Sequence, residues 1–188
     1  MNIRTRVLTG TALAVALGAG TFGAVSASAA QAESAPAAAA AATAKKDGGA
    51  EEKNFTTTTH LTIGAATRAA QAALDAAEQE NQKVTVAVVD RSGNTIVTLR
   101  GDGAGPQSYE SAQRKAFTAV SWNAPTSVLA GRLAQTPNLK DIPGTLFLGG
   151  GTPVQAKGAP VAGIGVAGAP SGDLDEKFAK AGADSLAK

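Results

Sequence analysis

A run of β-branched residues followed by a turn sequence is the feature that most restricts the fold of this chain. Residues 84–89 read Val-Thr-Val-Ala-Val-Val, which is typical of a strand, and residues 90–94 (Asp-Arg-Ser-Gly-Asn) have the chemistry of a turn. Residues 95–100 then predict the returning strand of a hairpin. A hairpin brings neighbouring strands together antiparallel, so this pattern favours an antiparallel sheet over an alternating strand–helix–strand fold.

Further helices and strands are predicted on both sides of the hairpin. Alanine-rich residues with apolar side chains at helical spacing predict a helix over 61–82, entered through Thr59 to Thr62. After the hairpin we expect helices over 107–122 and 125–135, short strands over 145–148, 153–156 and 161–166, and a last helix over 173–187 that begins at Ser171-Gly172-Asp173. Because the strands are grouped, the sequence predicts an α+β fold in which helices flank one antiparallel sheet.

The first thirty residues have the three parts of a cleavable signal peptide. Arg4 and Arg6 give a basic start, residues 7–25 are apolar, and small residues close the segment at 27–30 (Ala-Ser-Ala-Ala). The glycines within the apolar stretch and its small-residue end favour cleavage over a transmembrane anchor. The chain has no cysteine, which excludes a lipid anchor attached through that residue. We therefore expect a secreted protein with no stable membrane anchor.

The composition after this segment predicts a linker and then one domain. Residues 31–53 are small, polar or repetitive and have nothing large to bury, so we expect a disordered alanine-rich linker. Residues 54–188 are long enough for a single core. Cleavage would remove Arg4 and Arg6 from the 17 basic residues and leave all 15 acidic residues, so the mature chain is close to neutral. A nucleic-acid-binding role loses its electrostatic support.

Two glycine runs match parts of phosphate-binding motifs but lack their context. Residues 163–168 fit G-x-G-x-x-G, yet these glycines fall within a predicted strand, whereas a dinucleotide site needs them between a strand and a helix. We expect tight helix–sheet or subunit packing there instead. Gly149-Gly150-Gly151 is not followed by the Lys-Ser/Thr pair of a P-loop, so a tight strand connection is favoured.

Residues for conventional hydrolysis are scarce. The chain has one histidine, His60, no cysteine and no G-x-S-x-G sequence, so a nucleophilic triad would depend on a histidine at the edge of the domain. A dedicated enzyme is therefore disfavoured.

Two D-x-x-E pairs are candidate sites for a hard cation. The pairs are Asp75–Glu78 and Asp173–Glu176, each within a predicted helix. A spacing of three residues places both carboxylates on one side of a helix, where their oxygens could hold ferric iron. The alternative is a solvated face, and Asp173 is favourable near a helix N-terminus in any case. Both interpretations remain open.

The order of motifs in the domain resembles that of the GlcG/HbpS family of haem-associated proteins. The resembling stretches are 86–94 (Val-Ala-Val-Val-Asp-Arg-Ser-Gly-Asn), 115–119 (Lys-Ala-Phe-Thr-Ala), 149–154 (Gly-Gly-Gly-Thr-Pro-Val), 161–168, 173–177 (Asp-Leu-Asp-Glu-Lys) and finally Ala181-Gly182. Together they cover nearly all of residues 54–188. The export signal and the alanine-rich linker are similar to those of the secreted HbpS branch of this family.

The resemblance implies an antiparallel sheet flanked by helices in a ring-like homo-oligomer, an octamer. It implies that the protein binds haem outside the membrane, binds iron, and contacts a membrane sensor kinase of a two-component system that reports haem or oxidative stress. It places Thr118 in the haem site, although a hydroxyl that bonds a preceding carbonyl of its own helix is an equal alternative. Arg114 and Lys115 would pair with haem propionates or take ordinary surface roles.

His60 and Tyr109 are further candidates for the haem site. Imidazole and phenolate both ligate haem iron in proteins, and His60 is the single histidine of the chain. An exposed histidine near a helix start needs no such role, so this alternative stays open. A weak ligand such as the Thr118 hydroxyl would give a labile, exchangeable haem.

Three functions follow as hypotheses. The first is a secreted protein that sequesters haem and iron and modulates a sensor kinase. The second is haem degradation with iron release, for which the chain offers no flavin or nicotinamide motif. The third is an assembly module without haem, in which the strands of small residues serve packing alone.

Overall fold

The structure, a computed structural model, describes residues 49–187, and its compact unit spans Ala50–Lys188. The predicted signal peptide and most of the predicted linker lie outside the described residues. In chain order the elements are η1 (Glu52–Asn54), α1 (Ile63–Gln79), β1 (Thr85–Asp90), β2 (Thr95–Arg100), α2 (Pro106–Trp122), α3 (Thr126–Gly131), η2 (Arg132–Ala134), η3 (Pro137–Asp141), β3 (Gly151–Ala156), β4 (Ala159–Ala167), α4 (Gly172–Asp184) and η4 (Ser185–Ala187), where η marks a 3-10 helix.

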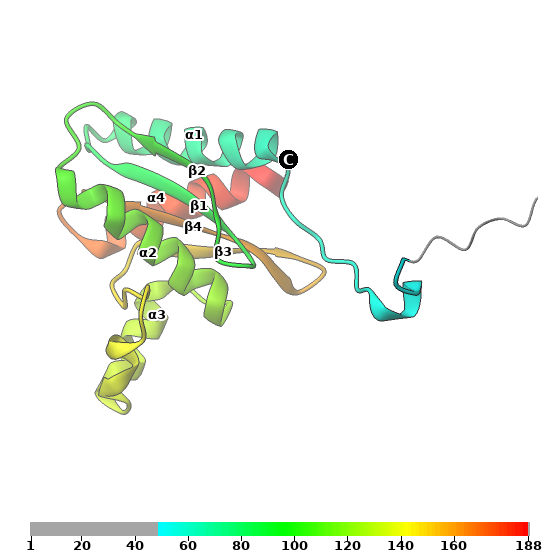
Figure 1. The fold of residues 1–188 in the computed structure, drawn as a ribbon. Coiled ribbons are helices and arrows are strands. Elements are labelled where there is room, and N and C mark those ends of the chain that lie inside the picture. Colours follow the sequence, from blue (N-terminus) through cyan, green and yellow to red (C-terminus); the bar gives the residue numbers. More distant parts are fainter. Residues whose placement is uncertain (1–48, 188) are drawn as a thin grey trace, which may run out of the picture. The chain divides into compact units, whose positions relative to one another are not determined.

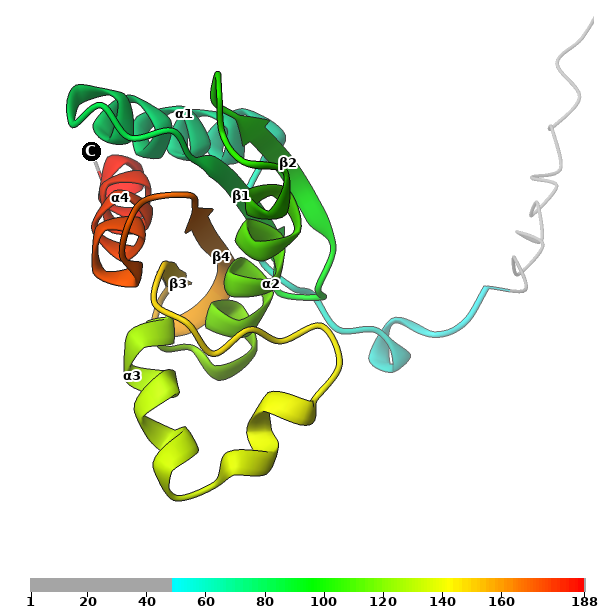
Figure 2. The same cartoon turned by 90° about the vertical axis from the view of Figure 1, so that its left-hand side faces the viewer.

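The four strands form one sheet in the order β2-β1-β4-β3, and each pair of neighbours runs antiparallel. Helices α1 and α4 pack together on one face of this sheet, and α2 covers the other (Figures 1 and 2). The α+β fold expected from the grouped strands is confirmed.

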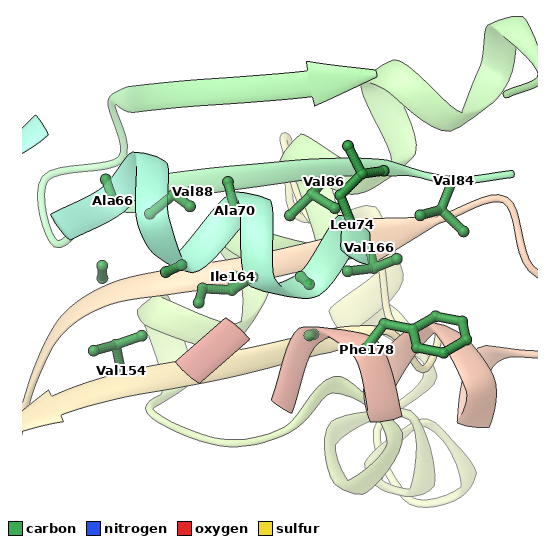
Figure 3. Close-up of a cluster of buried hydrophobic side chains, with 14 of the residues drawn as sticks. Ala66, Ala70, Leu74, Val84, Val86, Val88, Val154, Ile164, Val166 and Phe178 are labelled. Carbon is green, nitrogen blue, oxygen red and sulfur yellow. The ribbon is translucent and has the colours of Figure 1, made fainter. Parts of the chain in front are cut away.

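The alternation of side chains along β1 explains why residues 86–89 of this strand are all apolar. Val86 and Val88 point into the larger core between the sheet and helices α1 and α4 (Figure 3), whereas Ala87 and Val89 pack against α2. Both faces of the strand are therefore buried. Successive residues of a strand point to opposite faces, so a strand covered on both sides has no need of polar residues.

Helices α1 and α4 begin at side-chain caps that the sequence indicated. The hydroxyl oxygen of Thr62 accepts a hydrogen bond from the backbone N–H of Ala65 at 3.2 Å, and that of Ser171 accepts one from Leu174 at 3.2 Å. Each cap satisfies one of the backbone donors left free at a helix start.

The glycines of β4 serve tight helix–sheet packing, as the sequence predicted. A Cβ atom built on Gly163 would overlap the carbonyl oxygen of Ala116, and one built on Gly165 would overlap that of Ala112. Both carbonyls belong to α2, so the backbone of this helix lies directly against the strand. The first two glycines of the G-x-G-x-x-G run are thus inside a strand under a helix, which is not the setting of a dinucleotide-binding loop.

The strand predicted over 145–148 is wrong, because these residues form an irregular segment before β3. The backbone N–H of Leu146 donates to the hydroxyl of Thr118 at 2.8 Å, and Phe147 packs edge-on against Trp122 with ring centroids 5.3 Å apart. The apolar run is held by side chains of α2 and not by a neighbouring strand. The helix predicted over 125–135 ends at Gly131 as an α-helix and continues as η2.

Helix α3 and the short helices η2 and η3 form a segment between α2 and β3 that projects away from the sheet (Figures 1 and 2). We call residues 126–144 the arm. All of its residues after Leu129 are exposed or half-buried. None of the helices in the described part of the chain is both long and apolar enough to cross a membrane.

Candidate functional site

A buried ion pair joins α2 and α4 beside the end of β4. Lys115 Nζ is 2.7 Å from Asp175 Oδ2, and the two residues are only 5% and 3% exposed. Lys115 Nζ also donates to the carbonyl oxygen of Val166 at 3.0 Å, and Asp175 Oδ1 accepts from the N–H of Ala169 at 3.0 Å. The pair therefore fastens two helices to the end of β4.

Burial dominates the electrostatics of this pair. Loss of hydration raises the pKa of the Asp175 carboxyl above its usual value, while the hydrogen bond and the positive charge of Lys115 act in the opposite direction. A carboxylate in this position depends on its partner, because an unpaired charge out of water is costly. Lys115 is thus structural in this conformation, and an ordinary surface role for it is wrong. Pairing with a haem propionate stays a prediction, and it would require the ion pair to break.

Thr118 lies one turn beyond Arg114 on α2, and its side chain is fully buried. Its hydroxyl donates to the carbonyl oxygen of Arg114 at 2.7 Å, as expected for a helical threonine, and accepts from the N–H of Leu146. Both functions of the hydroxyl are used within the domain. Its placement in a haem site stays a prediction, and in this conformation the oxygen positions residues 145–147.

Arg114 and Tyr109 lie on the solvent side of α2. The Arg114 guanidinium pairs with Glu110 one turn earlier, and about half of the Arg114 side chain is exposed. Tyr109 is 47% exposed. A surface ion pair of this kind contributes little to stability, so the guanidinium is free to exchange Glu110 for another carboxylate.

His60 lies in the exposed segment that leads into α1. Its Nε2 is 2.7 Å from the hydroxyl oxygen of Thr58. Burial raises the pKa of the Asp90 carboxyl at the end of β1, but hydrogen bonds from Asn94 and Ser92 and, to a smaller extent, the charge of the His60 ring lower it. The net effect is a pKa below its usual value. The imidazole is accessible to a ligand.

The two D-x-x-E pairs differ in how many hydrogen bonds their carboxylate oxygens already accept. Asp75 and Glu78 are exposed on α1, and Asp75 Oδ1 accepts one hydrogen bond, from Gln71 at 2.6 Å. Glu78 lines an open pocket of about 260 Å³ between the end of α1 and the loop after β2. This pair is available to a cation.

Glu176, by contrast, holds the start of the arm. Its Oε1 accepts from the Ser127 hydroxyl at 2.5 Å, and its Oε2 accepts from the backbone N–H groups of Ser127 at 2.9 Å and Gly150 at 3.3 Å. Asp173 lies beside it on α4 and is exposed, and both line a pocket of about 460 Å³ against Pro153 of β3. A cation at this pair would compete with the arm for Glu176.

The structure therefore scatters the residues that the sequence singled out. His60 and the pair Asp75–Glu78 belong to the N-terminal part of the domain, Arg114 and Tyr109 to the outer side of α2, and Glu176 to the base of the arm. Within residues 49–187, no three histidine or acidic side chains gather into a metal-binding group. Of these residues, Arg114 offers an accessible guanidinium, His60 an accessible imidazole and Tyr109 an accessible phenol, on different parts of the domain.

Sequence reasoning missed the pairing of Lys115 with Asp175 and the hold of Glu176 on the arm. The first pair is separated by 60 positions and the contact between Glu176 and Ser127 by 49. Spacing within one helix cannot reveal such contacts. The available signal was a lysine amid alanines on the inner side of a predicted helix, where a charge needs a partner.

Comparison with known proteins shows what this domain is similar to. The protein family described as "Haem degrading protein HbpS-like" matches residues 61–184. A crystal structure of a double mutant of Streptomyces reticuli HbpS is 75% identical in sequence, with a TM-score of 0.73, over 73% of this chain and 94% of that one.

Two more distant relatives extend the comparison. A crystal structure of a PduOC:haem complex is 26% identical with a TM-score of 0.62, and covers 68% of this chain and 95% of that one. An uncharacterized 15.0 kDa protein of Citrobacter freundii is 31% identical over 113 residues, which are 57% of this chain and 80% of that protein.

Proposed function

We propose that this chain, which belongs to the HbpS-like family, binds haem reversibly and acts as a haem-sequestering and haem-sensing protein. The observation that carries the proposal is the 75% identity with HbpS over nearly all of that chain, within a family described by its relation to haem. A domain of similar fold crystallised in complex with haem supports it. By chemical type the exposed Arg114 suits a propionate, and the exposed His60 and Tyr109 each suit iron.

We assign the propionate contact to Arg114 on the outer side of α2. Its side chain is half exposed, and within residues 49–187 its guanidinium pairs with Glu110 of the same helix alone. A planar guanidinium can bind a carboxylate through two parallel hydrogen bonds, which suits a propionate. Lys115 and Thr118, the neighbouring members of the family motif, would support this site from within, since Lys115 fixes α2 to α4 and Thr118 fixes residues 145–147.

A haemin titration of the purified full chain tests this assignment through its Soret band. We expect saturation near one haem per subunit. Arg114→Ala should weaken the apparent affinity about tenfold, since loss of a charge-assisted pair costs on the order of 1.5 kcal/mol. Thr118→Ala should weaken it through the loosened segment 145–147 without moving the band, and Thr118→Ser, which keeps the hydroxyl, should restore it.

The controls of this titration separate direct from indirect contributions. Arg132→Ala removes an exposed cation from the arm and should leave the affinity unchanged. A band shift in His60→Ala or in Tyr109→Phe would identify the iron ligand. A band shift in Thr118→Ala would instead make its hydroxyl the ligand and contradict the positioning role given to it here.

We propose further that the chain binds ferric iron, at the pair Asp75–Glu78. Both carboxylates are exposed, whereas Glu176 of the second pair already holds the arm. Equilibrium dialysis should show that Asp75→Asn/Glu78→Gln loses most of the bound iron and that Glu176→Gln keeps it. The reverse result would move the iron site to Asp173–Glu176 and make binding compete with the arm.

We propose three further properties, each supported by the family resemblance. They are export, contact with a membrane sensor kinase, and assembly into an octamer. Protein recovered from the culture medium should begin near residue 30, and its native mass should be that of eight subunits. Its addition should change the rate at which the kinase phosphorylates itself. Retention of the intact chain by the cells would contradict export. An unchanged rate of kinase autophosphorylation would contradict the contact with the sensor kinase.

Haem degradation is the second candidate, favoured by the wording of the family description. It predicts that each subunit consumes several haem molecules when a reductant and oxygen are supplied. Sequestration predicts a single stoichiometric change of the spectrum and recovery of intact haem after extraction. The glycine run that would suggest a bound nicotinamide cofactor lies instead under α2.

A further inference from the structure

The two edge strands of the sheet differ in how they are protected from pairing with another strand. An edge strand presents unpaired backbone N–H and C=O groups, and proteins usually block them with proline, bulges or covering side chains. The outer backbone edge of β3 is blocked at Gly151 and Pro153, and Gln155 beyond them is engaged through its side chain. The hydroxyl of Thr126 accepts from the N–H of Gly151 at 2.8 Å, Pro153 has no N–H, and Gln155 is tied to Asn123 through their side chains at 2.9 Å.

The outer edge of β2 has much less protection. A bulge interrupts its pairing with β1 at Ile96, close to the turn. Residues 97–100 contain neither proline nor a charged side chain before Arg100. Among the residues that the structure describes, no backbone group outside the sheet hydrogen-bonds to this stretch. In Figure 2 the strand runs along the side of the sheet away from β3.

The pairing with β1 shows which residues of β2 face outward. The N–H of Gly101 donates to the carbonyl oxygen of Val84, so this residue turns its backbone groups toward β1. Because hydrogen-bonding direction alternates along an antiparallel strand, Leu99 and Val97 also face β1. Thr98 and Arg100 therefore direct their N–H and C=O groups away from the sheet.

We propose that β2 pairs antiparallel with β2 of a second copy of this chain, across a two-fold axis at Thr98, and joins two sheets into one. This inference deepens the assembly part of the proposed function by naming the contact between two subunits. A contact of the same strand with itself closes after two copies and leaves neither β2 edge open. The remaining contacts of a larger assembly would lie elsewhere on the domain.

The charge of Arg100 selects this arrangement. Antiparallel pairing centred on Thr98 places each Arg100 opposite Ile96 of the other copy, so that the two guanidinium groups lie at opposite ends of the contact. Parallel pairing would place like charges side by side, which destabilises a strand pair. A centre shifted to Leu99 would also bring the two arginines nearer to each other.

A residue of α2 adds apolar surface beside the strand. Gln113 reaches β2 through a hydrogen bond of 3.4 Å to the Thr98 hydroxyl, and Tyr109 lies one turn earlier on the same side of the helix. Tyr109 is 47% exposed, and tyrosine is enriched in protein interfaces. The second copy would cover it.

Single cysteines test the contact directly, because the chain has no cysteine of its own. Residues opposite each other in a hydrogen-bonded pair have Cα atoms about 5.5 Å apart, within the range that a disulfide spans. Under mild oxidation, most of the full-length Thr98→Cys chain should migrate as a covalent dimer on a non-reducing gel. Gln155→Cys, on the blocked β3 edge and more exposed, should remain monomeric. Absence of the Thr98→Cys dimer, or equal cross-linking of both variants, would overturn the proposal.

Thr98→Pro supplies a second readout that does not depend on oxidation. Proline is tolerated on an edge strand whose N–H faces away from its neighbour, so the domain should keep its circular dichroism spectrum. Its native mass, measured by light scattering, should fall to half or less of the wild-type mass. An unchanged mass in the folded variant would refute the β2 contact and leave the proposed octamer intact. A wild-type chain that is itself monomeric would refute both, whereas the propionate contact assigned to Arg114 is tested separately by the haemin titration.

Discussion

Replacement of Gly165 by alanine is expected to destabilise the domain by roughly 3–5 kcal/mol, at the upper end of what single substitutions do. The added Cβ would overlap the carbonyl oxygen of Ala112 and approach the backbone nitrogen of Ala116. Both atoms belong to the backbone of α2, which cannot rotate away as a side chain could. The helix would have to lift from β4, and the contacts of Lys115 and Thr118 on the same helix would loosen with it. Urea unfolding followed by circular dichroism measures the change.

Gly131→Ala is the matched control for this substitution. Nothing lies within 4 Å of a Cβ built on Gly131, which ends α3. Alanine there should be neutral or slightly stabilising, because it restricts the unfolded chain without a clash. A loss of less than about 1 kcal/mol in Gly165→Ala, below the usual cost of overpacking, would contradict the direct contact between α2 and β4.

Replacement of Lys115 by methionine is expected to cost about 3–5 kcal/mol at neutral pH, because it leaves the buried Asp175 carboxylate without its partner. Methionine keeps much of the volume of the lysine stem, so the loss reports the charge and its hydrogen bonds. The pair Lys115→Met/Asp175→Asn should recover a large part of the loss, since the amide oxygen can still accept from Ala169. Chemical unfolding of the two variants measures the difference.

The dependence of this loss on pH has a definite sign. Burial already raises the pKa of Asp175 in the folded protein, and removal of the Lys115 charge raises it further. A carboxyl with a raised folded pKa holds its proton more tightly in the folded state than in the unfolded state, so folding is favoured as pH falls through that pKa. The difference in free energy of unfolding between the wild type and Lys115→Met should therefore be smaller at about pH 5 than at pH 7. A difference in free energy of unfolding that increases as the pH falls would refute a buried, ionised Asp175.

The fold was largely predictable because its strongest signals are local. The hairpin over 84–100 follows from β-branched residues around a turn, and helices α1 and α2 begin within two residues of the positions that the sequence indicated. The strand expected over 145–148 failed for a tertiary reason. An apolar run of four residues fits a strand as well as a loop packed on a helix, and the partner that decides, Thr118, lies 28 positions away.

The candidate site was predictable by residue type and not by location. The sequence indicated that Arg114, His60 and Tyr109 offer suitable groups, and all three are accessible. The alanines around Lys115 indicated that it lies near the inner side of the helix, but nothing in the sequence identified its partner Asp175 or the contact of Thr118 with Leu146. Burial along a helix changes within a single residue, and the direction of the inner face depends on the sheet beneath it.

A haemin titration of the wild-type full chain, read at the Soret band and followed by extraction of the haem, tests the central claim most directly. Reversible haem binding predicts a new Soret band that saturates near one haem per subunit, with intact haem recovered afterwards. A titration that matches free haemin at every step would contradict the claim and leave this domain a module of assembly.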